Sequence, residues 1–181
     1  MKSNYKNILK TIFVVSLSCF LALVLNFYSI QYSGENPLVS SAHGIDVIIL
    51  ITSIVFSVWF FKNFFNHGIL HLWQGVFVGF GVLGFSLIFY SLFLYWEVSK
   101  DEKKLMIEYL LELKKNLEQN KKTILENMSE ENYQKNMHLM LQSTPGDIVF
   151  HDIFQKMVAS AFLPIFAVLF SSLAMRKTIK V

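Results

Sequence analysis

The chain has 181 residues, of which 54% are hydrophobic and 15% aromatic, and it carries a formal net charge of +3. The apolar residues gather into long blocks, which excludes an ordinary soluble domain. Basic residues stand at the two ends of the chain, where they indicate headgroup and topology chemistry rather than a nucleic-acid partner.

Four apolar stretches with almost no internal charge predict four membrane-spanning helices. They run from Ile12 to Ile30, Ile45 to Phe61, Val76 to Trp96 and Met157 to Met175. Each has about 17–25 residues, enough for a helix to cross roughly 30 Å of hydrocarbon. The expected fold class is therefore all-α, a four-transmembrane-helix bundle.

The first stretch has the basic start of a signal peptide, but it is too long for one and no small-residue cleavage site follows it. We therefore expect a retained span. A cleaved or lipidated start is the alternative, because Ser16-Leu17-Ser18-Cys19 weakly resembles a lipoprotein box. Cys19 is the single cysteine, so no intramolecular disulfide can form.

The connections between the stretches differ greatly in length. Gln31 to Gly44 is rich in turn residues, Lys62 to Gly68 reads as a tight hairpin, and Glu97 to Gln155 is a long polar segment. This division predicts three parts of the chain: spans one to three over 1–96, an amphipathic helical hairpin over 97–155, and span four with a basic tail over 156–181.

Orientation follows from positive charge near the short loops. The N-terminus, the second hairpin and the C-terminal tail carry Lys or Arg, whereas the first loop carries none. This pattern places both termini in the cytoplasm and the 97–155 segment on the other side of the membrane. The long segment holds more lysines than the proposed inner side, but the rule weakens in loops of about 60 residues.

The 97–155 segment carries helical periodicity. Apolar residues recur at spacings of three and four from Met106 to Ile124, which predicts a helix with an apolar seam. No Gly or Pro interrupts the chain between Phe85 and Thr144, so span three is expected to continue unbroken out of the membrane as far as Met128. Ser129 then reads as the N-cap of a second amphipathic helix, and Asp147 as the cap of the helix that becomes span four.

A resemblance to a known family follows from several of these features. They are the lead-in from His67 to Phe80, the charged amphipathic helix, Met128-Ser129-Glu130-Glu131, and a last span that ends in a basic tail. Together they resemble the four-span family catalogued as domain of unknown function 4199, common in Bacteroidota. The family's Gly-x-Ile-Ser-Phe lead-in is here Gly68-Ile69-Leu70-His71-Leu72. The resemblance implies a bacterial inner-membrane protein and no particular activity.

Two sets of residues are candidates for contacts. Small residues on span three would allow close helix packing, or instead homodimerisation or docking of another membrane protein: Gly75, Gly79, Gly81 and Gly84. Apolar residues of the long segment form a stripe that predicts a partner contact: Leu110, Leu113, Leu117 and Ile124.

In this interpretation, ionisable groups are confined to the wet ends of the spans. Asp46 is placed at the outer mouth of span two, Glu97 at an interface, and Asp152 with Lys156 at the membrane surface. Proton relays and ion sites need buried ionisable groups, so this distribution argues against proton-coupled transport. No nucleophile, acid–base pair or phosphate loop can be assembled, so we do not expect an enzyme.

Metal or cofactor sites are not expected. His67 and His71 have the spacing of two ligands on one helix face, but no third ligand lies nearby, and a helix start is the simpler interpretation. Met137-His138-Leu139-Met140 could supply soft ligands to Cu(I), although methionines at helical spacing usually serve packing.

The function expected from the sequence is that of a non-catalytic scaffold or subunit. Its helical hairpin would serve as a contact arm for a second copy or for a membrane or periplasmic protein, and its other partner would be the lipid bilayer. The competing hypothesis is a small-molecule or lipid transporter without proton coupling.

Overall fold

The computed structural model describes residues 2–39, 43–66, 71–100 and 104–174, without the side chains of residues 2–4, 43, 159–165, 167, 168 and 171–174. The described part is all-α. It has seven α-helices and one π-helical turn: α1 Lys2–Tyr32, α2 His43–Phe60, η1 Phe61–Phe65, α3 Leu72–Ser99, α4 Lys104–Gln119, α5 Lys121–Leu125, α6 Glu130–Leu141 and α7 Pro145–Ala174.

Four long helices pack into one bundle. Helix α3 contacts α1, α2 and α7, and α2 contacts α1 and α7. Three of these helical stretches are long and apolar enough to cross a membrane, Tyr5–Tyr32, Gly44–Phe65 and Leu72–Ser99, among the residues that are described. The chain is therefore a membrane protein by the length and composition of its helices.

The interior of the bundle is apolar and the outside is apolar too. Buried residues form two clusters, one centred on Leu23, Leu87 and Leu94, and a smaller one around Ile8 and Phe61. The outer surface shows large exposed side chains such as Leu25 and Phe77. An apolar exterior around an apolar core is what a lipid solvent permits.

Helices α1 and α3 approach each other closely along the bundle. The Ser16 hydroxyl donates to the carbonyl of Val82 at 3.3 Å, and the Ser86 hydroxyl donates to the carbonyl of Ser16 at 3.4 Å. These bonds satisfy hydroxyl groups that lipid could not solvate. The same contact brings Ile12 of α1 against Gly81 of α3.

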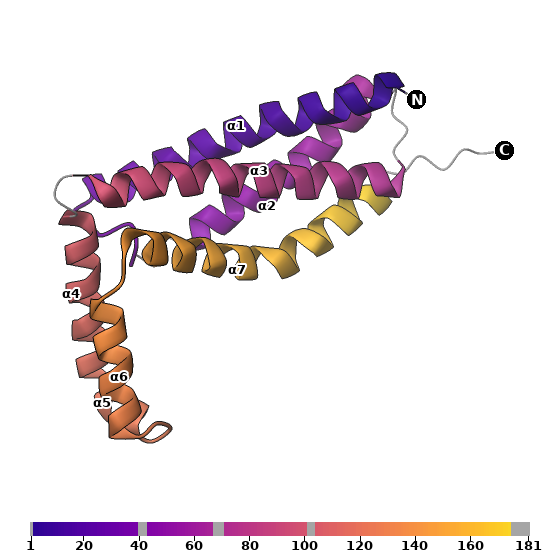
Figure 1. Cartoon of the computed structure of the whole chain (residues 1–181). Coiled ribbons are helices and arrows are strands. Elements are labelled where there is room, and N and C mark those ends of the chain that lie inside the picture. The colour runs from indigo at the N-terminus through magenta and orange to yellow at the C-terminus, as the bar shows by residue number, and fades with distance from the viewer. Residues whose placement is uncertain (1, 40–42, 67–70, 101–103, 175–181) are drawn as a thin grey trace.

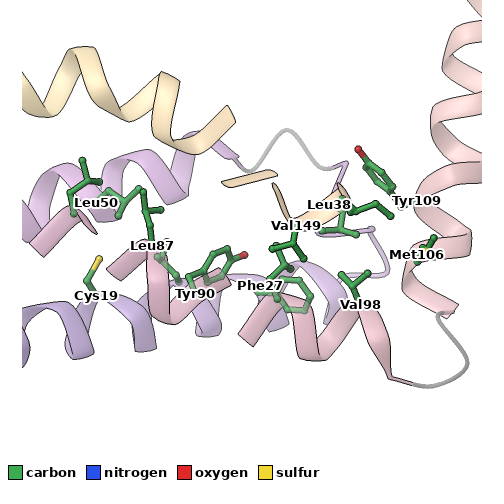
Figure 2. Packing of buried hydrophobic residues seen from close by; sticks show 14 of the residues in the cluster. Cys19, Phe27, Leu38, Leu50, Leu87, Tyr90, Val98, Met106, Tyr109 and Val149 are labelled. Carbon is green, nitrogen blue, oxygen red and sulfur yellow. The ribbon is translucent and has the colours of Figure 1, made fainter. Parts of the chain in front are cut away.

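The remaining helices form an arm, which we define as residues 104–141 (α4 to α6). Figure 1 shows α4 running crosswise to the long axis of the bundle, with α5 and α6 beside it, so that the molecule has the shape of an L. Met106 and Tyr109 are buried where the arm meets the bundle, in the same cluster as Leu38, Val98 and Val149 (Figure 2).

The expectation that span three continues unbroken to Met128 is wrong. Helix α3 ends at Ser99, and Lys100 takes an extended conformation with φ −82° and ψ 172°. Its ammonium lies over the Trp96 ring at 4.5 Å and pairs with Glu97 at 2.8 Å. A separate helix α4 can then bury Met106 and Tyr109 against the bundle, which a straight extension could not do.

The second amphipathic helix is confirmed as α6. Ser129 is its N-cap, and the Ser129 hydroxyl accepts a hydrogen bond from the Asn132 amide. The interpretation of Asp147 as a cap needs a correction. Thr144 is the capping residue of α7, and Asp147 stands three residues later as its partner in a capping box, accepting from the Thr144 hydroxyl at 2.7 Å.

Candidate functional site: a buried charge cluster

Three charged side chains meet inside the bundle, where α7 packs on α2. The Lys156 ammonium of α7 lies 2.7 Å from both carboxylate oxygens of Asp152, one turn earlier on the same helix. It also lies 3.2 Å from Oδ2 of Asp46, in the first turn of α2. We call this group the charge cluster. It links the two helices directly.

The cluster is nearly closed to solvent. Asp46, Asp152 and Lys156 are 4%, 5% and 3% exposed. Asn26 of α1 donates its side-chain amide to Oδ1 of Asp46 at 2.8 Å, and the Tyr90 ring of α3 lies 4.9 Å from the Lys156 ammonium. All four long helices thus contribute. Burial of charge in a low-dielectric site is costly unless the charges are paired and hydrogen-bonded, as they are here.

The apolar frame of the cluster is visible in the structure. Figure 2 shows Tyr90 in the row of buried side chains between Leu87 and Phe27. Val149 of α7 belongs to the same buried set. The charged groups are therefore buried beside this apolar core.

This arrangement corrects the expected exposure of the ionisable residues. Asp46 lies in the first turn of α2, at the start of span two as expected, but it is buried. Asp152 and Lys156 do not keep wet tips, because the i, i+4 spacing turns both toward α2. The Asp-x-x-x-Lys spacing was the available signal. The sequence alone does not show that α7 packs on α2. This packing brings in the third charge, Asp46, from more than 100 residues away.

A second buried carboxylate lies nearer the arm. Glu97 is 2% exposed, accepts a hydrogen bond from the Tyr28 hydroxyl, and pairs with Lys100 at 2.8 Å. Glu97 lies two residues before the end of α3, where an interface position was expected, but its side chain is buried rather than wet. It borders a polar pocket of about 550 Å³ between the α1–α2 connection and α4, which includes Glu35, Lys104 and Glu112.

The predicted packing glycines occupy different environments on α3. Gly75 and Gly79 are buried, whereas Gly84 is exposed. A methyl group added at Gly81 would stand 2.5 Å from Cδ1 of Ile12, and one added at Gly84 would meet nothing within 4 Å. The close approach at Gly81 therefore belongs to the α1–α3 pair, and Gly84 does not take part in it.

The predicted contact stripe lies on the inner side of the arm. Leu110 and Leu113 are half-buried and pack against the main core, and Leu117 and Ile124 are half-buried further along. The most exposed apolar residues of α4 are two others, Leu111 at 61% and Ile107. Sequence periodicity marked the inner seam and missed this outer pair.

Two titratable groups near the arm have shifted pKa values. Burial raises the pKa of Tyr109, and the Asp152 carboxylate adds to the shift, which places the base of the arm within electrostatic reach of the charge cluster. At the tip, the hydrogen bond from Lys121 lowers the pKa of Glu130, helped by Gln134.

Metal ligands do not converge in the part of the chain that is described: no three His, Cys, Asp or Glu side chains are grouped to hold an ion. His71 is the N-cap of α3, which supports the interpretation as a helix start, and the Gln74 side chain accepts a bond from its amide at 3.2 Å. His67 lies outside the described residues.

Comparison with known proteins places the chain in a family. The family model described as "protein of unknown function (DUF4199)" matches residues 10–177. Because this match covers nearly the whole sequence, the chain belongs to that family. No curated protein and no solved structure matches the chain.

Proposed function

We propose that this protein is a non-catalytic, four-span component of a bacterial inner membrane that associates with a second copy of itself through its arm. Both termini would lie in the cytoplasm, and the arm outside it. The observation that carries the proposal is the self-complementary outer face of α4.

The fourth crossing is assigned to α7. This helix has 30 residues, which at 1.5 Å per residue exceeds the thickness of the hydrocarbon. It packs against α2 and α3 inside the bundle. The start of α1 and the end of α7 lie at the same end of the bundle (Figure 1), as an even number of crossings requires.

The outer face of α4 is centred on Leu111. Residues three, four and seven positions away from it share this face: Lys104, Ile107, Glu108, Lys114, Lys115 and Glu118. Two copies laid antiparallel about Leu111 would set Lys104 opposite Glu118 and Glu108 opposite Lys114. The two Leu111 side chains at the centre would be flanked by four opposite-charge pairs, and Ile107 would lie against the aliphatic stem of Lys115 of the other copy.

The orientation of the arm suits such a contact. Because α4 runs crosswise to the spans, a two-fold axis parallel to the spans reverses its direction in the second copy. Antiparallel pairing is therefore the arrangement that a dimer in one membrane imposes. Leu110 and Leu113 hold α4 to its own bundle, and Leu117 and Ile124 lie further along the same inner side of the arm, away from the pairing face.

Cross-linking in membrane vesicles tests the pairing. In a Cys19→Ser background, Leu111→Cys is expected to give a covalent dimer with a short bis-maleimide, because the two residues face each other across the axis. Leu139→Cys is the matched control, since Leu139 is similarly exposed, at 55%, but lies on α6. Equal yields at both positions, or a product between residue 111 and a different protein, would refute self-association.

Exchange of the charged residues provides a second, independent test of the pairing. Glu108→Lys alone and Lys114→Glu alone each place like charges opposite one another in both halves of the dimer, and the yield at residue 111 should fall. The combined variant restores opposite charges and should restore the yield. A combined variant that is as poor as the single ones would argue against the antiparallel register.

A transporter is the second candidate, and the polar pocket beside Glu97 favours it. A solute path would need that pocket to connect with the bundle interior. Flux into proteoliposomes that fails in Glu97→Gln and survives Leu111→Glu would support transport. Flux equal to that of protein-free vesicles would exclude it for the solute tested.

A further inference from the structure

We propose that the charge cluster is a proton-binding site, and that Asp46 is the group that takes up the proton. This inference is independent of the arm contact and goes beyond it. Ionisable residues inside membrane bundles are costly to keep and usually serve a function. The cluster serves no role in the association proposed above.

The two carboxylates share the ammonium unequally. Asp152 holds Lys156 with both oxygens at 2.7 Å, whereas Asp46 reaches it with one oxygen at 3.2 Å. Lys156 therefore keeps a close counter-charge when Asp46 becomes neutral. Protonation of Asp152 would instead remove the nearer partner, so the geometry selects Asp46.

The uptake of a proton is balanced within the site. The Asp46 carboxylate combines with one proton at Oδ2 to form a neutral carboxyl group, and no other bond changes. Oδ1 continues to accept the Asn26 amide, because a protonated carboxyl retains acceptor capacity. What is lost is the attraction between α2 and Lys156 of α7, so protonation loosens the contact between these helices.

Other titratable side chains face the cluster from the neighbouring helices. Cys19 of α1 lies within the electrostatic reach of Asp46, and Tyr90 of α3 within that of both carboxylates. Tyr109 of α4 lies within that of Asp152. The thiol and the two phenols already carry their protons at neutral pH, so among these groups acidification acts on the carboxylates alone.

A proton can reach Asp46 from the end of the bundle that carries the arm. Asp46 lies in the first turn of α2, directly after the exposed Gly44 and Ile45. The proton would not have to cross the packed core. Tyr109, at the base of the arm, lies within the electrostatic reach of Asp152. A change of charge at the cluster therefore occurs next to the base of the arm.

Spectroscopy on the whole protein in lipid nanodiscs tests this proposal. With ¹³C-labelled aspartate, acidification of the wild type should produce a carboxylic C=O band of a buried acid that is absent from Asp46→Asn. Asp147→Asn, which removes an exposed and equally labelled carboxylate, should leave the band unchanged. A band that persists in Asp46→Asn, or no buried-acid band in the wild type, would overturn the proposal.

A distance measurement separates proton binding from a purely structural ion pair. Spin labels at Ile48→Cys of α2 and Phe150→Cys of α7, both exposed positions, in a Cys19→Ser background should move apart on acidification. The change should be absent from Asp46→Asn at every pH. If Asp46→Asn does not fold, Asp46→Glu should shift the midpoint of the change. A distance that is constant with pH, or that depends on sodium at fixed pH, would contradict the assignment.

Discussion

The side chain with the greatest structural consequence is Lys156, because two carboxylates depend on one ammonium. Lys156→Met leaves Asp46 and Asp152 buried without their shared counter-charge. Breaking a buried pair in this way costs about 3–5 kcal/mol. We expect the free energy of unfolding in detergent micelles to fall by this amount, whereas exposed Lys135→Met should change it by about 0.5 kcal/mol or less. Equal effects would show that the cluster contributes no specific stability.

Gly81 is a second position where a single added methyl group is expected to change the stability of the protein. Gly81→Ala forces its methyl group against Ile12, and overpacking of this kind costs about 1–3 kcal/mol. Gly84→Ala meets open space and should gain up to about 1 kcal/mol from helix propensity. Adding Ile12→Val to Gly81→Ala should recover part of the loss. Thermal unfolding of the three variants and the wild type measures these differences, and identical effects at both glycines would contradict the close approach.

Among the helices, the first turn of α7 has a pH-dependent cap. Hydrogen bonds from the Thr144 hydroxyl and amide lower the pKa of Asp147. Because this pKa is lowered in the folded protein, the cap stabilises the helix at pH values above the pKa of an aspartate in the unfolded chain, which is about 3.9. This stabilisation is lost as the pH falls through the lower, folded value.

The NMR shift of the Thr144 amide should therefore follow the titration of Asp147. The dependence should disappear in Asp147→Asn, which cannot titrate. A Thr144 shift with no pH dependence in the wild type would mean that the capping box does not form in solution.

Helix boundaries show how far local sequence can predict this fold. Apolar length located the helices of the bundle, and Ser129 located α6, because both signals are local. The end of α3 at Ser99 carried no Gly or Pro signal. It follows from the burial of Met106 and Tyr109 and from the Lys100 contacts, which are tertiary and invisible to periodicity.

The candidate site was hidden for the same reason. Asp46, Asp152 and Lys156 stand near the ends of apolar runs, where wet positions are the usual expectation. Their burial depends on which helices are neighbours. The outer pair Ile107 and Leu111 was also missed, because the inner seam gave the stronger pattern.

At the scale of the whole molecule, the account depends on the bundle crossing the membrane with the arm on one side. With four crossings, as proposed, the start of α1 and the end of α7 would lie on one side of the membrane, and the crosswise arm would lie along the membrane at the opposite end of the bundle. The proton-binding cluster and the arm contact would then face the same compartment.

Sided labelling of single cysteines tests this arrangement most directly. In a Cys19→Ser background, Leu111→Cys and Ser3→Cys would be exposed in turn to a membrane-impermeant maleimide on intact spheroplasts and on inverted vesicles. We predict that residue 111 reacts only from the outside of spheroplasts and residue 3 only from the outside of inverted vesicles. Reaction of both residues from the same side would contradict the account.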